Sequence, residues 1–101
     1  MPFTNDDIDT LEGNEDASRE DEACARQRAI NAGMWSLQGS YGRSMMAAIE
    51  AGDCMLGEHD ARDYWGNHIP SRSQVQAGTK GSREFVVEHN GEAWAAMLDA
   101  A

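Results

Sequence analysis

The sequence lacks several features that define common classes of protein. It contains no run of about 18 apolar residues, which a transmembrane helix would need. Its acidic start, MPFTNDDIDT, lacks the apolar core of a secretory signal. Its two cysteines, Cys24 and Cys54, belong to no CxxC pair and no paired Cys/His spacing. We therefore expect a cytoplasmic protein, away from membranes, whose cysteines are buried or half-buried thiols, with a disulfide between them as the alternative.

Sequence signatures of catalysis are missing as well. Ser40 lies in QGSYG, but a nucleophile elbow has glycines two residues before and two residues after the serine, and here the glycines are Gly39 and Gly42. The stretch GTKGS, residues 78–82, is too short and wrongly ordered for a phosphate-binding P-loop. We therefore expect no enzymatic activity and no cofactor.

The segment GEHDARDYWGNH has the densest set of polar functional groups. Imidazole and carboxylate groups bind zinc, manganese and iron, so a metal-binding module or metal-dependent enzyme is one hypothesis. However, the segment contains neither HExxH nor HxH. We favour a polar loop with capping and ion-pair roles, and expect no metal. The side chains that a metal site would use are Glu58, His59, Asp60, Asp63 and His68.

Negative charge is what the sequence has in excess, and it is concentrated at one end. The chain of 101 residues has a net charge of −10, and residues 1–22 alone hold nine carboxylates against one arginine. Residues 64–83 contain three bases and no acid. Net acidity disfavours direct binding of nucleic acid, whose phosphates would be repelled, and favours a partner protein with a basic surface.

The N-terminal acids suggest the sharpest functional hypothesis. An extended chain advances about 3.3–3.6 Å per residue, close to the spacing of about 3.4 Å between phosphates along one DNA strand. A row of carboxylates could therefore imitate a phosphate track, whereas the alternative is a block that only keeps the protein dissolved. The acids predicted to bind a partner are Asp6, Asp7, Asp9, Glu12, Glu15, Asp16, Glu20, Asp21 and Glu22.

The length and the patterning predict one small, mainly helical domain. Residues 1–16 have few apolar anchors, so we expect an acidic, loosely ordered N-terminal arm followed by a helical domain over 17–101. Ser18 is a suitable N-cap for a first helix, and Gly33 can end it. The next stretch, MWSLQGSYGRSMMAAIEAG, has apolar residues at helical spacing and predicts a core helix.

The second half of the chain is less regular. Residues 52–72 are rich in glycine, aspartate and aromatic residues and predict a long, irregular central loop. The last segment has two interpretations. We favour a helix that begins after Ser82 and runs to Met97. The alternative is a strand over EFVVEH that turns at Asn90-Gly91 into a final helix, with one short strand or hairpin near residues 74–88.

Three tryptophans and two tyrosines are the aromatic residues of greatest interest. Trp35 and Trp94 fall in predicted helices and are expected in or near the core. Tyr64 and Trp65 fall in the irregular loop, and we expect them to contact a partner, because these residue types dominate binding hot spots.

The chain resembles the small acidic proteins of phages and mobile elements. MLGEHDARDYWGNHIPSR and GTKGSREFV are similar to segments of uncharacterised mobile-element proteins. In size and charge, though not in a diagnostic motif, the chain is similar to the anti-CRISPR inhibitors. This resemblance implies an inhibitor that acts in the cytoplasm of a bacterial host. It would bind a Cas subunit or surveillance complex and block its DNA or RNA site. An accessory subunit of a mobile-element transfer or replication machinery is the alternative, and the sequence leaves the oligomeric state open.

Overall fold

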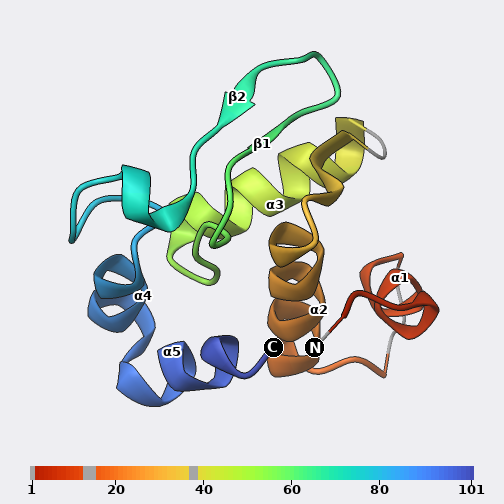
Figure 1. Ribbon diagram of the computed structural model, residues 1–101. Coiled ribbons are helices and arrows are strands. Elements are labelled where there is room, and N and C mark those ends of the chain that lie inside the picture. Colours follow the sequence, from red (N-terminus) through yellow and green to blue (C-terminus); the bar gives the residue numbers. More distant parts are fainter. Residues whose placement is uncertain (1, 13–15, 37–38) are drawn as a thin grey trace.

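The computed structural model describes residues 2–12, 16–36 and 39–101 (Figure 1). Helices dominate this part of the chain, and the only sheet within it is one short antiparallel hairpin. The prediction of a mainly helical, single-domain fold is confirmed. In chain order the elements are α1 (Asn5–Leu11), α2 (Arg19–Asn31), the 3₁₀ turn η1 (Met34–Ser36), α3 (Gly39–Ala51), β1 (Ala61–Arg62), β2 (His68–Ile69), the 3₁₀ turn η2 (Arg72–Gln74), α4 (Arg83–Asn90) and α5 (Glu92–Asp99).

Helix α2 begins and ends where the sequence predicts. The Ser18 hydroxyl oxygen accepts a hydrogen bond from the backbone N of Asp21 at 3.0 Å, and the Asp21 carboxylate accepts one from the backbone N of Ser18 at 3.2 Å. This capping box satisfies two backbone donors near the helix start. After Asn31 the chain turns at Gly33, whose φ of +71° is accessible to glycine and costly for other residues. Helices α1, α3 and α5 all contact α2.

The stretch after α2 is less regular than predicted. The apolar spacing predicts one continuous helix, whereas the structure has the turn η1 followed by α3. Trp35 lies in this turn, is only 2% exposed, and belongs to the core cluster formed with α2 and α3. Burial of so large an apolar side chain stabilises the position of this turn against α2 and α3.

The C-terminal segment is helical. Ser82 caps α4 by accepting a hydrogen bond from the backbone N of Phe85 at 3.2 Å. The helix interpretation is therefore confirmed, and the alternative of a strand or hairpin near residues 74–88 is wrong, because the chain there holds η2, a loop and α4. A single helix as far as Met97 is also wrong. Gly91, with φ of +91°, separates α4 from α5.

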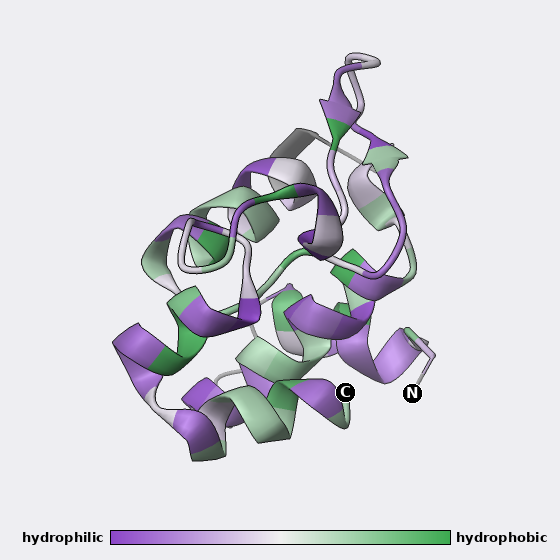
Figure 2. Ribbon diagram, turned by 60° about the vertical axis from the view of Figure 1, so that its left-hand side comes forward, coloured by the Kyte–Doolittle hydropathy of each residue, from purple (hydrophilic) through white to green (hydrophobic). Residues whose placement is uncertain are grey.

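The hairpin lies in the central segment instead. Ala61 pairs with Ile69 and Arg62 with His68, and the hairpin projects from the helices (Figures 1 and 2). Strands of two residues are too short to show the alternation of apolar and polar residues by which a strand is predicted. The rest of this segment is the irregular loop that the sequence predicts.

The N-terminal residues differ from the predicted loose arm, because helix α1 packs on α2. Asp7 is only 4% exposed and forms an ion pair with Arg28 of α2, with 2.6 Å between Oδ1 and Nη2. Phe3 and Leu11, both half-buried, pack against the core. The sequence predicts that Asp7 binds a partner. In the structure it anchors α1 to the rest of the domain instead.

The core consists of two apolar clusters that share α2. One lies among α2, η1, α3 and the hairpin, and the other among α2, α4 and α5. Gln27 of α2 is fully buried and bonds twice to the backbone of Met55: Oε1 accepts from N, and Nε2 donates to O, both at 2.9 Å. The amide thereby satisfies the backbone of a buried loop residue that would otherwise lack partners.

Candidate functional site

The predicted partner-binding acids occupy different environments in the structure. Asp7 is buried, and hydrogen bonds from Arg28 lower the pKa of its carboxyl group. This carboxylate could face a partner only if the ion pair broke, so its role is structural. Glu22 is half-buried, Asp16 is exposed, and Glu15 lies outside the described residues.

The remaining predicted acids form what we call the acidic face. Each of them is exposed, and they lie on α1, directly after it, and in the first turn of α2. Two also make contacts within the fold: Glu12 accepts a hydrogen bond from the Tyr41 hydroxyl at 3.0 Å, and Asp21 completes the capping box of α2. The members of the acidic face are Asp6, Asp9, Glu12, Glu20 and Asp21.

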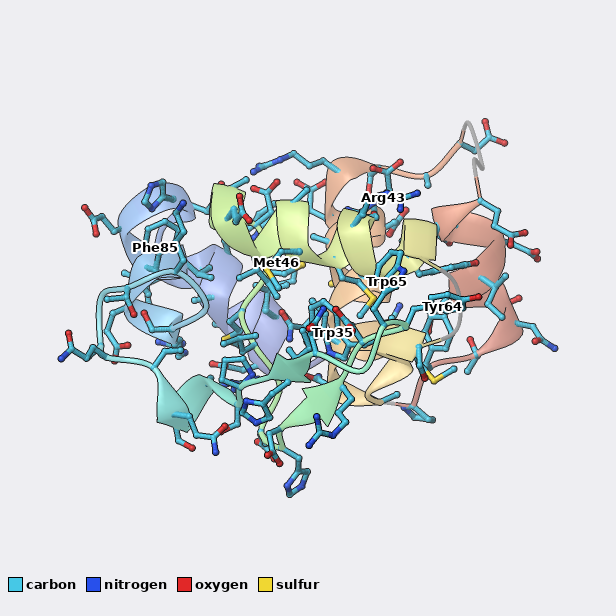
Figure 3. The ribbon with its side chains drawn as sticks, turned by 90° about the horizontal axis from the view of Figure 1, so that it is seen from above. Trp35, Arg43, Met46, Tyr64, Trp65 and Phe85 are labelled. Atoms are coloured by element: carbon cyan, nitrogen blue, oxygen red, sulfur yellow. The ribbon has the colours of Figure 1, made fainter. Side chains whose placement is uncertain are left out.

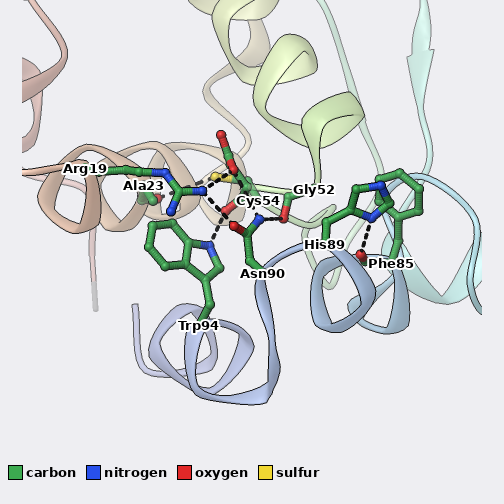
Figure 4. A network of polar contacts seen from close by, with 9 residues as sticks. Arg19, Ala23, Gly52, Cys54, Phe85, His89, Asn90 and Trp94 are labelled. Atoms are coloured by element: carbon green, nitrogen blue, oxygen red, sulfur yellow. Dashed lines mark hydrogen bonds and ion pairs between the residues drawn. The ribbon is translucent and has the colours of Figure 1, made fainter.

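Arg19 is the base nearest to these acids in the sequence. Its side chain contacts the loop after α3 and helices α4 and α5 instead (Figure 4). Its Nη2 donates to Asp53 Oδ1 at 2.8 Å and to Asn90 Oδ1 at 2.7 Å, and its guanidinium carbon lies 4.1 Å from the ring centroid of Trp94. The indole of Trp94 in turn donates to the backbone O of Asp53 at 2.9 Å. This junction ties α2 to the loop after α3 and to α4 and α5.

The other two basic residues of α2 are also engaged within the fold. Nε of Arg26 donates to Ser44 Oγ at 3.0 Å, and Arg28 is held by its ion pair with Asp7. Across the described ranges of the chain, no ion pair joins a lysine or arginine to a member of the acidic face. The negative charge of this face is therefore not balanced locally, and it is available to a basic partner.

The helical form of α1 corrects the geometric basis of the phosphate-track hypothesis. That hypothesis assumes an extended chain, whereas a helix rises only about 1.5 Å per residue. Over Asn5–Leu11 the carboxylates therefore cannot follow the phosphates of one strand one for one. The charge is carried by exposed side chains of α1 and of the start of α2 instead of an extended track.

Tyr64 and Trp65, which we call the aromatic tip, lie at the end of the hairpin. They are 60% and 61% exposed, and they are the exposed large apolar side chains of the described residues. Their ring centroids are 5.3 Å apart and their planes are inclined by 77°, an edge-to-face arrangement. The exposure agrees with the expectation that these two residues are accessible to a partner, whereas Trp35 is buried and Trp94 half-buried.

The turn that carries the aromatic tip is held by Asp63. One carboxylate oxygen of Asp63 accepts hydrogen bonds from the backbone N of Trp65 at 2.9 Å and of Asn67 at 2.8 Å. The other accepts from Nδ2 of Asn67 at 3.2 Å, and Gly66 adopts φ of +82°. The sequence predicts capping roles for the polar side chains of this loop, but does not single out Asp63 as the residue that holds the turn. The spacing of an aspartate ahead of a glycine and an asparagine was the signal that could have revealed it.

A small apolar cavity of about 160 Å³ adjoins the aromatic tip, between the hairpin and α3. Trp35, Met46, Ile69 and Trp65 contribute to its walls, and Arg43 lies beside Trp65 (Figure 3). The apolar surface around the tip is therefore continuous with the core cluster beneath it.

The acidic face and the aromatic tip occupy separate parts of the surface, both away from α4. In Figure 1 the hairpin tip lies at the top of the molecule and α1 at the lower right, and in Figures 1 and 3 both are to the right of α4. The hydrogen bond from Tyr41 of α3 to Glu12 links the N-terminal part of α3 to the end of α1. A partner with a broad surface could contact both features at once.

The candidate metal ligands do not form a ligand cluster in the described part of the chain. His68 Nε2 lies 3.0 Å from Asp60 Oδ2, and this hydrogen bond lowers the pKa of Asp60. The carboxylate of Asp63 is occupied by its turn, and Glu58 and His59 are exposed. The metal hypothesis therefore lacks an assembled site among these residues.

Both cysteines are free thiols. Cys54 is fully buried, and burial raises its pKa to about 12. Cys24 is half-buried, and its pKa is also raised, chiefly by burial. Because the thiolate is the reactive form, neither environment favours nucleophilic chemistry.

No protein-family model matches the chain, and the comparisons with curated proteins and with solved structures find no similar protein. The function therefore has to be inferred from the residues of the chain itself. None of the helices in the described ranges has the length and apolar character that a membrane span requires.

Proposed function

We propose that this protein is a non-enzymatic inhibitor that binds a nucleic-acid-handling protein complex, a CRISPR–Cas surveillance complex being the favoured partner. It occupies the basic surface that would otherwise hold DNA or RNA. The observation that carries the proposal is the acidic face, whose carboxylates form no ion pair with a described lysine or arginine. The site of action is the cytoplasm of a bacterial host.

The proposed mechanism is electrostatic and steric. A net charge of −10, concentrated toward the N-terminus, attracts a basic groove over a long range and accelerates association. Carboxylates of the acidic face then pair with lysines and arginines of the groove, and the body of the domain blocks access. Since α1 is helical, the inhibitor replaces the phosphates as a group and does not follow their spacing.

Neutralisation of the acidic face tests the proposal. The variant D6N/D9N removes two exposed carboxylates that form no side-chain hydrogen bond or ion pair within the described residues. The control E84Q/E88Q removes two exposed carboxylates from α4, on the opposite side of the molecule. The two variants carry the same net charge, so they differ only in where the charge is lost.

Association and dissociation with purified, guide-loaded surveillance complexes are measured at low, physiological and high salt. D6N/D9N is expected to associate more slowly and to show a weaker salt dependence than the control, because rim charges act mainly on the association rate. Equal kinetics for the two variants would contradict the proposal, as would a failure of the unmodified protein to bind any complex in the panel.

A further inference from the structure

We infer that the aromatic tip is a pre-formed insertion that enters a pocket of the partner in which an unstacked nucleobase is normally bound. This inference rests on the proposed function. It adds the class of nucleic-acid site that is occupied: one that receives a single-stranded or flipped-out base, and not only the backbone of a duplex.

The first argument is the rigidity of the loop that presents the two rings. The Asp63 carboxylate bridges to residues two and four positions ahead, and the backbone N of Asp63 also donates to the O of Asn67 at 3.0 Å. Nη1 of Arg62 donates to the O of Gly66 at 2.9 Å. A loop fixed in this way loses little conformational entropy on binding, which increases affinity for a given set of contacts.

The second argument is the chemistry and the geometry of the rings. Tyrosine and tryptophan faces stack on the aromatic side chains and guanidinium groups that also bind nucleobases. Because the ring planes of Tyr64 and Trp65 are inclined by 77°, the pair cannot continue a stack of parallel bases. One ring can stack in the pocket while the other closes its edge, which suits a pocket for a single base.

Electrostatic repulsion disfavours a second copy of this chain as the partner of the aromatic tip. Two copies would each have a net charge of −10 and would repel one another, so self-association through the apolar tip is disfavoured. A nucleic-acid site instead offers basic groups for the phosphates and a stacking surface for the bases. The exposed carboxylates of the acidic face and the exposed rings of the aromatic tip match these two kinds of group.

The test uses the guide-loaded surveillance complex that binds the unmodified protein. W65A is compared with Q76A, a substitution of an exposed side chain in the loop after η2. W65A is expected to raise the Kd about 30-fold or more, by a factor that does not change with salt, because the lost contact is apolar. Q76A is expected to leave the Kd unchanged.

Asp63 provides a test of the pre-formed loop. D63A retains both rings but loses the hydrogen bonds that position them, whereas the amide oxygen of D63N can still accept from the backbone N of Trp65 and Asn67. D63A is expected to weaken binding about tenfold, with the thermal melting temperature unchanged and the indole of Trp65 more mobile by NMR relaxation. D63N is expected to restore both the affinity and the order of the indole.

Competition identifies the kind of pocket. A single-stranded oligonucleotide of the target sequence is expected to prevent binding of the unmodified protein more effectively than the same sequence as a duplex. This difference should shrink for W65A. Equal competition by the two nucleic acids, or an unchanged Kd for W65A, would overturn the inference.

The two proposals fail in different ways. If D6N/D9N weakens binding and W65A does not, the electrostatic mechanism stands and the insertion is wrong. If W65A weakens binding and D6N/D9N behaves like E84Q/E88Q, the insertion is supported and the electrostatic mechanism is wrong. If no complex in the panel binds the unmodified protein, both are wrong.

Discussion

Helix α1 and the hairpin tip are both at the surface, but contacts of different range hold them in place. Asp7 of α1 pairs with Arg28, a residue distant in the sequence, and Phe3 and Leu11 pack on the core. The tip is held by Asp63, whose carboxylate partners lie within four residues. The position of α1 therefore depends on the folded domain and on ionisation, while the shape of the tip depends on its own short sequence.

Among the variants that test this difference between α1 and the tip, D7A is expected to have the largest effect. Removing the carboxylate leaves the half-buried guanidinium of Arg28 without its ion-pair partner, which should lower the free energy of unfolding by about 2–3 kcal/mol and release α1. Urea unfolding measures the loss of stability, and NMR reports α1 and the Trp65 indole separately. D6N, which changes an exposed neighbour, is the control. Equal disturbance of α1 and the tip by D7A would contradict the distinction.

Acid is expected to release α1 as well. The Asp7 pKa is held below its ordinary value of 3.8, chiefly by hydrogen bonds from Arg28. A carboxyl group whose pKa is lower in the folded state stabilises that state above the unfolded pKa, and this stabilisation is lost as the pH falls through the folded pKa. The amide signals of α1 should therefore stay native at neutral pH and change only below pH 3.8. In D7N this transition should vanish; its persistence would assign it to another group.

A smaller and more local effect is expected from G66A. Gly66 adopts φ of +82° and has open space around its α-carbon, so alanine there should cost about 1–2 kcal/mol through the backbone alone. Gly78 has φ of +86° and equally open surroundings in a different loop, which makes G78A a matched control. Both variants should lose similar stability, but only G66A should increase the mobility of the Trp65 indole. An ordered indole in G66A would show that the turn does not position the tip.

The smallest effect is expected at the contact between the end of α1 and α3. Burial and the hydrogen bond to Glu12 raise the pKa of Tyr41. E12Q should move this pKa back toward its ordinary value of 10.0 and change stability by less than about 0.5 kcal/mol, because the contact is exposed. Absorbance of the phenolate during a pH titration measures the shift. An unchanged titration would mean that Glu12 has no part in holding Tyr41.

The difference between contacts that are local and contacts that are distant in the sequence also explains which features could be predicted. The Ser18 cap and the Gly33 turn are local signals, and both ends of α2 follow from them. The packing of α1 could not be predicted, because it needs Arg28 as a partner. The burial of Gln27 could not be predicted either, because its hydrogen-bond partner is the backbone of Met55, which is distant in the sequence.

The candidate site was predictable to a similar extent. Tyr64 and Trp65 stood out as aromatic residues in a segment without helical periodicity, and both are exposed. Their exposure did not follow from the pattern alone, because Met55, Leu56 and Ile69 of the same segment are buried. Which acids are exposed could not be predicted, because this depends on where each arginine is directed. Arg19, for example, meets Asp53 and Trp94 from two distant segments.

Hydrogen–deuterium exchange of the protein, alone and bound to a guide-loaded surveillance complex, tests the central claim most directly. We expect the complex to slow backbone exchange in α1, at the start of α2 and in the turn between β1 and β2, while α4 exchanges as in the free protein. Protection confined to α4 and α5, with α1 and the hairpin turn unchanged, would contradict it.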